Sequence, residues 1–346
     1  MVIDLFTHKF KSEIQEIHGV HRITIETPFP VGPVSVYIYK IDDSYVMYDA
    51  GLDMGNWKKV FLSALNEIQI PLKDIDICFV SHEHTDHIGL LRGFKKENPN
   101  IKIMMSEITY KTLAWESNPE NREKLEELAW DNAKLMIKYG MKEERAKNLV
   151  EWSKLWAKIR KDQKPDRLLH DGDEIEFPSN KLKMIWTPGH ALGHMCIWDE
   201  KNRYLFSGDH ILSRITPHIG NFVVNPDIDD IHNFDNILKH YLESLDRIDN
   251  LHPKIIFPGH QEVIYDPSDR INEIKLHHVN RLREMMKVIK NRPLTPMRIS
   301  KLHFGRGLDE LNSMLALSEV LGHLIYLENL NKVRRVEKNN KILFVS

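Results

Sequence analysis

The sequence predicts an α/β fold that carries a helical insertion and ends in a winged-helix-like domain. Three observations support this prediction. Apolar strand patterns alternate with helical patterns, and four of these strands run into a loop that bears His or Asp. Residues 106–165 interrupt the strand patterns with helical ones. Beyond residue 270, three helical patterns precede a pair of alternating segments that indicates a hairpin.

Each element follows from local periodicity and from the residues that end it. Pro71 ends the first helix, Asn118-Pro119 begins the second, and Gly140 stops it. We predict strands at 23–25, 34–39, 45–48, 75–80, 101–105, 174–177, 182–186, 195–198, 204–207 and 255–257. We predict helices at 57–68, 119–139, 142–160, 234–248, 271–291, 296–302 and 308–329, followed by a hairpin within 333–345.

The helical insertion carries an aromatic stripe. Helical spacing places Leu149, Trp152, Trp156 and Ile159 on one face. Such a stripe is most often packed in a core, and we favour that interpretation. The alternative is a lid whose apolar wall covers a substrate.

Composition excludes several classes of protein. The chain has 346 residues, of which 42% are hydrophobic and 28% charged, as in soluble globular proteins. No apolar run approaches the roughly 20 residues of a membrane helix, and residues 1–5 do not resemble a signal peptide. Cys78 and Cys196 both lie in apolar runs, so we expect free thiols and a cytoplasmic protein without a membrane partner.

The net charge of −2 conceals an uneven distribution. Residues 270–346 contain 15 Lys and Arg and 7 Asp and Glu, which gives +8, while the rest carries 33 basic and 43 acidic residues, which gives −10. A basic segment can bind an anion such as single-stranded RNA. It can also dock on the acidic body of a second copy, as in a homodimer, or remain solvated, and we favour these two interpretations.

The densest functional signal follows the strand at 75–80. His82, His84, Asp86 and His87 lie within six residues, between that strand and a helix start at Ile88. Imidazole and carboxylate are the ligands of zinc and of similar divalent ions. A strand-to-helix loop directs its side chains in different directions, so that His82 and His84 can face one metal while Asp86 and His87 face another. This pattern favours two adjacent metals.

Three further strands end in the same kind of residue. His190 follows the strand at 182–186, Asp209 follows 204–207, and His260 follows 255–257. Proline or glycine beside them indicates tight turns that hold the side chains at the strand edge. The sequence therefore predicts one site that distant segments build together.

These motifs resemble those of the metallo-β-lactamase superfamily of hydrolases, over about residues 23–265. Asp49-Ala50-Gly51 matches its first motif, and His82-x-His84-x-Asp86-His87 matches its signature. The resemblance implies a four-layer αββα sandwich in residues 1–268, with the insertion at about 106–165. Residues 269–346 resemble the C-terminal winged helix of lactamase-β-2-like members, and the chain is also similar to glyoxalase II-like hydrolases.

The resemblance also implies roles for individual residues. His82, His84 and His190 would hold one metal ion, Asp86, His87 and His260 a second, and Asp209 would bridge both. Asp49 would steady the histidine loop. We further expect His210 either to face the substrate or to have a hydrogen-bonded structural role. We expect His194 to stabilise its loop, and His277 and His278 to lie at the surface.

The predicted function is hydrolysis by a metal-bridging hydroxide, with a small ester, thioester or lactone as the substrate and Asp86 as the proton shuttle. We expect two divalent ions, with zinc favoured and iron or manganese as alternatives. Two other functions stay open. The winged-helix subgroup includes a single-strand endoribonuclease, and the iron-dependent persulfide dioxygenases share the histidine signature.

Overall fold

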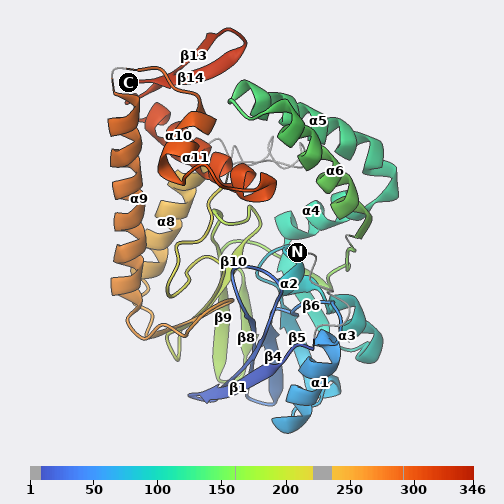
Figure 1. The fold of residues 1–346 in the computed structure, drawn as a ribbon. Helices are drawn as coiled ribbons and strands as arrows, with labels where there is room; N and C mark the ends of the chain where they lie inside the picture. The colour runs from blue at the N-terminus through green and yellow to red at the C-terminus, as the bar shows by residue number, and fades with distance from the viewer. Residues whose placement is uncertain (1–8, 160, 221–235, 291) are drawn as a thin grey trace. The chain divides into compact units, whose positions relative to one another are not determined.

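The structure, a computed structural model, describes residues 9–159, 161–220, 236–290 and 292–346 (Figure 1). The chain divides into two compact units. Unit 1 contains Met1–Tyr110, Asp162–Pro217 and Ser244–Ile271. Unit 2 contains Lys111–Lys161, His218–Glu243 and Asn272–Ser346. The structure thus groups most of the helical insertion with the C-terminal segment, whereas our domain boundary at 268/269 remains a prediction from the sequence.

The first sheet of unit 1 is mixed. Its order among the described residues is β1-β2-β3-β4-β5-β6-β7. The pairs from β1 to β4 are antiparallel and those from β4 to β7 are parallel. Its strands are β1 (Ser12–Ile17), β2 (Val20–Ile25), β3 (Val34–Ile41), β4 (Ser44–Tyr48), β5 (Ile75–Phe79), β6 (Lys102–Ser106) and β7 (Arg167–Leu169). The parallel pairs need crossover connections, and these place helices beside the sheet.

The second sheet has the order β12-β11-β10-β9-β8 in the described part of the chain. Only the pair β11 and β12 is parallel among its described ladders. Its strands are β8 (Glu174–Phe177), β9 (Asn180–Trp186), β10 (Met195–Asp199), β11 (Tyr204–Gly208) and β12 (Ile255–Pro258).

An apolar core joins the two sheets. One buried cluster contains Tyr37 and Phe79 of the first sheet together with Phe206 and Phe257 of the second. The ring of Phe206 stacks on Tyr39 with centroids 5.0 Å apart. Side chains that alternate along each strand therefore meet between the sheets, as in a sandwich, and the predicted α/β class is confirmed.

Helices of unit 1 cover the outer side of the first sheet (Figure 1). They are α1 (Trp57–Glu67), η1 (Leu72–Asp74), α2 (Thr85–Ile88) and α3 (Leu91–Glu97). The rings of Trp57, Phe61 and Phe94 are fully buried and contact one another in sequence. The apolar spacing of residues 57–68 thus forms the helix that it predicted, and its buried face packs against α3.

Unit 2 contains most of the remaining helices and a hairpin. Its elements, some of which begin in unit 1 or continue into it, are α4 (Glu107–Ser117), η2 (Pro119–Asn121), α5 (Arg122–Lys138), α6 (Glu143–Ile159), α8 (Ile237–Asp249), α9 (Pro267–Ile289), α10 (Pro296–His303), α11 (Glu310–Asn329), β13 (Arg334–Lys338) and β14 (Lys341–Val345). The helices and the hairpin predicted after residue 270 are all present. None of the helices in the described part of the chain combines the length and the apolar character needed to cross a bilayer.

The insertion helices α5 and α6 pack on C-terminal helices. Met136 and Val150 share a buried cluster with Met297 of α10 and Leu317 of α11. Gly140, with φ +98°, allows close approach here, because a Cβ at this position would lie 2.6 Å from Oγ1 of Thr295. This glycine therefore ends α5 and also lets the N-terminus of α10 approach closely.

The aromatic stripe of α6 is only partly buried. Leu149 packs against the cluster, but Trp152 is 64% exposed. The side chains of Trp156 and Ile159 lie outside the described residues. The prediction that the whole stripe packs in a core was wrong for Trp152.

Our expectation that His278 lies at the surface was also wrong. Its side chain is fully buried, and its Nδ1 lies 3.0 Å from Nε2 of His323. The reason is periodicity, because His278 falls on the same face of α9 as Ile274 and Met285, which are buried in unit 2.

Candidate metal centre

Four strand ends of unit 1 deliver the predicted ligands to one place. The segment after β5 carries His82, His84, Asp86 and His87, and the last two lie in α2. The segments that follow β9, β11 and β12 carry His190, Asp209 and His260. Apolar strand residues anchor each of these segments in the core, so the polar side chains at the ends are held in fixed positions.

The structure brings all seven predicted ligands together in three overlapping groups. These are His82–His84–His190, His82–His87–Asp209 and Asp86–His87–His260. Within each group, the ligand atoms lie within 4.8 Å of one another. The His-x-His-x-Asp-His loop therefore contributes to every group, and each later strand end completes one of them.

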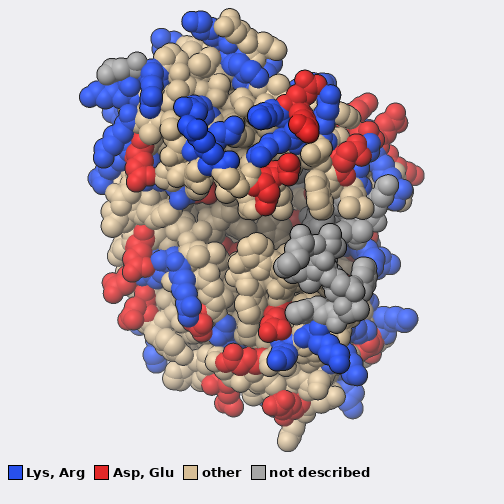
Figure 2. Space-filling model, viewed as in Figure 1, with Lys and Arg blue, Asp and Glu red and all other residues tan. Residues whose placement is uncertain are grey.

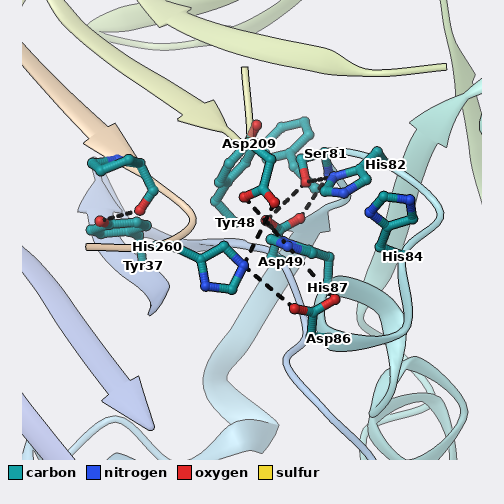
Figure 3. A network of polar contacts seen from close by, with 12 residues as sticks. Tyr37, Tyr48, Asp49, Ser81, His82, His84, Asp86, His87, Asp209 and His260 are labelled. Carbon is teal, nitrogen blue, oxygen red and sulfur yellow. Dashed lines mark hydrogen bonds and ion pairs between the residues drawn. The ribbon is translucent and has the colours of Figure 1, made fainter. Parts of the chain in front are cut away.

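Two of the three groups, His82–His84–His190 and Asp86–His87–His260, share no residue, and we call them the outer groups. In the first, Nε2 of His190 lies 3.0 Å from Nδ1 of His84. In the second, Nε2 of His260 lies 3.4 Å from Oδ2 of Asp86. Figure 3 shows the side chains of Asp86, Asp209 and His260 pointing toward a common centre.

Asp209 contacts members of both outer groups. Its Oδ1 lies 3.6 Å from Nε2 of His87, and its Oδ2 lies 3.5 Å from Nε2 of His190 and 3.6 Å from Nε2 of His260. Gly259 makes this possible, because a Cβ there would lie 2.6 Å from Oδ1 of Asp209. The carboxylate of Asp209 thus lies between the two outer groups.

Hydrogen bonds to Nδ1 of three histidines determine which ring nitrogen faces the centre of the cluster. A carboxylate and a carbonyl only accept, so Nδ1–H of His87 donates to Asp49 (2.8 Å) and Nδ1–H of His260 donates to the carbonyl of Pro33 (2.8 Å). Ser81 Oγ donates to Asp49 at 2.9 Å, and accepts from Nδ1 of His82 at 2.8 Å. All three rings therefore turn Nε2 toward the centre.

These inward atoms fit a cation. Nε2 of His82, His87 and His260 and Oδ1 of Asp209 are buried and have no hydrogen-bond partner among the described residues. Buried polar atoms are normally satisfied, and those that are not indicate a missing ion or water. Three imidazole lone pairs and a carboxylate suit a divalent metal ion.

The electrostatics of the metal-free protein favour the metal-binding protonation state at some of these ligands and the protonated form at others. Burial raises the pKa of Asp86, but His87 and His260 outweigh it and lower that pKa to about 2. Burial, followed by His87 and His84, lowers the pKa of His82 well below its usual value. At neutral pH, the metal-free protein thus holds an ionised Asp86 and a neutral His82, the forms that bind metals. Burial lowers the pKa of His87, but Asp209 and Asp49 outweigh it and raise that pKa well above its usual value, so a metal ion bound there must displace a proton.

Asp49 links two of the ligands. It is fully buried with φ +67°, and it accepts the backbone N–H of Ser81 at 2.7 Å as well as the Ser81 hydroxyl. Together with its bond to His87, this fixes the orientation of His82 through Ser81. Ser81 gave no signal in the sequence beyond its place next to His82.

His194 and His210 lie beside the cluster. His194 is buried, its Nε2 accepts the backbone N–H of Asp209 at 3.1 Å, and its Nδ1 lies 2.8 Å from Oγ1 of Thr187. It therefore supports the loop that carries Asp209. His210 is fully buried with its ring 5.8 Å from that of His194, and burial lowers its pKa to about 3. Its contact with substrate remains a prediction.

Comparisons with known proteins agree with this site. Residues 29–260 match the model of the metallo-beta-lactamase superfamily, and residues 282–345 match that of the metallo-beta-lactamase-like C-terminal domain. The probable metallo-hydrolase YqjP of Bacillus subtilis is 26% identical over 337 residues, covering 94% of this chain and 97% of the relative. The beta-lactamase-like protein 2 homolog of Caenorhabditis elegans is 35% identical over 120 residues, or 35% of each chain.

Solved structures show the same fold. A metallo-beta-lactamase family protein from Thermus thermophilus, TTHA1429, superposes with a TM-score of 0.75 at 25% identity, covering 95% of this chain and 99% of that one. A beta-lactamase domain protein from Burkholderia ambifaria has the same TM-score of 0.75 at 20% identity, covering 96% and 94%. On its motifs, its sandwich and its matched length, this chain belongs to the metallo-beta-lactamase superfamily of metal-dependent hydrolases.

Proposed function

We propose that this protein is a dinuclear-metal hydrolase that acts on a small ester, thioester or lactone. The observation that carries the proposal is the set of four buried, inward-facing ligand atoms without hydrogen-bond partners among the described residues. Each buried polar atom left unsatisfied costs about 1–3 kcal/mol. Four such atoms without a bound cation would lower the free energy of unfolding by several kcal/mol in total, roughly 4–12 by the same estimate.

Two of the three compact groups share no residue, which supports two ions rather than one. By the resemblance to the superfamily, His82, His84 and His190 would hold the first ion, and Asp86, His87 and His260 the second. Asp209, which contacts members of both trios, would be shared. We favour zinc, since imidazole and carboxylate are its usual nitrogen and oxygen ligands, although iron and manganese accept the same set.

When bound, two such ions supply Lewis acidity and lower the pKa of water toward ~7, which provides a nucleophile at neutral pH. The chain supplies the rest. Asp86 is ionised at neutral pH, so its carboxylate can accept a proton and return it to a leaving group. Asp49 accepts a 2.8 Å hydrogen bond from Nδ1 of His87 and so keeps Nε2 of that ring directed toward the centre.

The acyl class of substrate is supported by the reaction type and by the insertion. Activated water reacts readily with a carbonyl carbon that a Lewis acid polarises. The insertion is rich in tryptophan, which motivates an apolar acyl group, and within unit 2 the side chain of Trp152 is 64% exposed. The name of the Bacillus subtilis relative supports metal-dependent hydrolysis but names no substrate.

The test measures turnover of a panel of p-nitrophenyl esters, acyl thioesters and lactones by protein loaded with zinc, manganese or iron. We expect two metal ions per chain and turnover of at least one acyl class. Asp86→Asn should retain the fold by circular dichroism and lose activity about 100-fold or more, as expected for removal of a general acid–base group.

The outcomes separate the competing functions. Fewer than one metal ion per chain, or equal activity in the Asp86→Asn variant, would contradict the proposal. Selective iron binding with oxygen consumption on a persulfide would indicate a dioxygenase instead. Cleavage of single-stranded RNA without acyl turnover would indicate an endoribonuclease.

A further inference from the structure

Unit 2 contains a cavity lined by positive charge. Its volume is about 250 Å³. Lys142, just before α6, and Arg145, in its first turn, line it together with Arg298 and Lys301 of α10 and Arg306 of the loop that follows. Met141 and Met297 complete the lining, and both are only 3% exposed. Figure 2 shows Lys and Arg side chains gathered in the upper part of the view, over the region of α10.

No carboxylate balances this charge. None of the seven lining residues is acidic, and none of the five cations forms an ion pair with an Asp or Glu of the described residues. Arg145 is held in place by neutral acceptors, since its Nη1 donates to the carbonyl of Leu308 at 3.0 Å and to Oγ of Ser313 at 2.8 Å. Elsewhere in unit 2 basic residues do find partners, as in the pair of Lys154 with Glu126 at 2.9 Å.

The crowding of like charges destabilises the empty cavity. Burial, followed by the charges of Arg145, Lys142, Arg298 and Arg306, lowers the pKa of Lys301. Like charges so placed repel each other, and an anion between them relieves the repulsion. The arrangement is therefore more favourable with an anion bound than without one.

The geometry points to this cavity as a binding site for a diphosphate group, either free or carried by a small ligand such as a nucleotide. Guanidinium groups bind phosphate oxygens in pairs, and lysine binds them as a point charge. The charge of five cationic side chains is enough to balance more than one phosphate group. The volume lies just below the roughly 300–1,000 Å³ of pockets that enclose a whole ligand, so the phosphates enter, beside the two methionines, and the rest of the ligand stays outside.

A calorimetric titration of the metal-loaded protein tests this site. The probes are ADP, inorganic pyrophosphate, adenosine and a single-stranded RNA oligomer. The test variant is Arg298→Gln with Arg306→Gln, both exposed residues without side-chain hydrogen bonds to the described residues. The matched control is Arg334→Gln with Lys338→Gln, which removes the same charge from the exposed strand β13 of the same unit.

We expect pyrophosphate and ADP to bind, adenosine not to bind, and the test variant to weaken binding about tenfold or more while the control changes it less than twofold. Tighter binding of ADP identifies a nucleotide, whereas equal binding identifies the free diphosphate anion, and both support the site. Diphosphate also ligates metals, but both variants leave the histidine–aspartate cluster intact. Undiminished binding in the test variant therefore overturns the proposal, as does equal weakening in the control, or binding of RNA that pyrophosphate does not displace.

Discussion

Asp49 and His87 form a fully buried pair in which Nδ1 of the imidazole donates to the carboxylate across 2.8 Å. The bond turns the opposite nitrogen, Nε2, toward Asp209 and Asp86. Through Ser81 the same carboxylate also orients His82. One aspartate outside the ligand set thus controls two ligands.

Replacing Asp49 by Asn should lower metal affinity or activity about 10–100-fold, because the amide no longer fixes the tautomer of His87. Asn tolerates the left-handed backbone at φ +67°, so the fold should survive. The measurement is a competitive chelator titration. Asp42→Asn is a matched control, since Asp42 also has a positive φ of 53° but lies in an exposed turn. Equal affinities in the two variants would contradict the role of Asp49.

Replacing Gly259 by Ala should remove bound metal. A Cβ would lie 2.6 Å from Oδ1 of Asp209 and 2.8 Å from Cε1 of His87, so both side chains must move. Metal content by mass spectrometry checks this prediction. Gly307→Ala is the control, because nothing lies within 4 Å of its Cβ position, and we expect full metal content there. Unchanged metal content in the Gly259 variant would show that the centre tolerates displacement.

Removing metal with a chelator should lower the melting temperature, and zinc should restore it. The cause is that metal binding stabilises only the folded state, by about 4.1 kcal/mol at a free concentration 1,000 times the dissociation constant. The buried ligand atoms without partners among the described residues are the groups that the metal would satisfy. Differential scanning calorimetry measures the shift, which should shrink in Asp49→Asn. An identical melting temperature with and without chelator would argue against a structurally coupled site.

Replacing Leu317 by Ala should lower the free energy of unfolding by about 2–5 kcal/mol. Leu317 is fully buried where α11 packs on the insertion helices, so its loss leaves a cavity. Leu311→Ala on the same helix is the control, because Leu311 is 58% exposed and its loss should cost less than about 0.5 kcal/mol. Denaturant titration compares the two. Similar midpoints would mean that this packing contributes little.

Acidification should destabilise unit 2 through His278. Burial, followed by the proximity of His323, lowers its folded-state pKa to about 2, against ~6.5 when unfolded. Below pH ~6.5 the unfolded chain binds a proton that the folded chain does not, so this stabilisation is full above that pH and declines as pH falls toward 2. From pH 7.5 to 5.5 the loss is about 1.4 kcal/mol.

The check on this last prediction is the variant His278→Gln, which keeps a donor for Nε2 of His323 but does not titrate. Denaturant titrations at pH 7.5 and 5.5 should show a smaller loss in the variant than in the original chain. Equal losses would assign the pH dependence to other groups.

Local patterns were enough for most of the fold and for the seven candidate ligands, which the structure brings together. Helical spacing at 57–68 and the apolar run at 75–80 correspond to α1 and β5, because burial of one face imposes the period. Strand β1 was missed, since its pattern is largely exposed and carries no apolar alternation. Strand β7, three residues long, was too short to produce a signal.

The supporting residues of the metal centre could not be found in the same way. The carbonyl of Pro33, which holds His260, is 227 residues away along the chain, and no side-chain chemistry marks it. Ser81 and Thr187 are ordinary polar residues until the fold places Asp49 and His194 beside them.

The sequence by itself determined which side chains can ligate metal and where the strands that carry them end, because ligand chemistry and burial period are local properties. Only the tertiary structure decided which segments meet. It buried His278, packed the insertion on α10 and α11, and assembled five cations from segments about 150 residues apart around one cavity. Such contacts depend on how helices pack against one another. Sequence periodicity predicts which face of a helix is buried, but it does not predict which other element packs on that face.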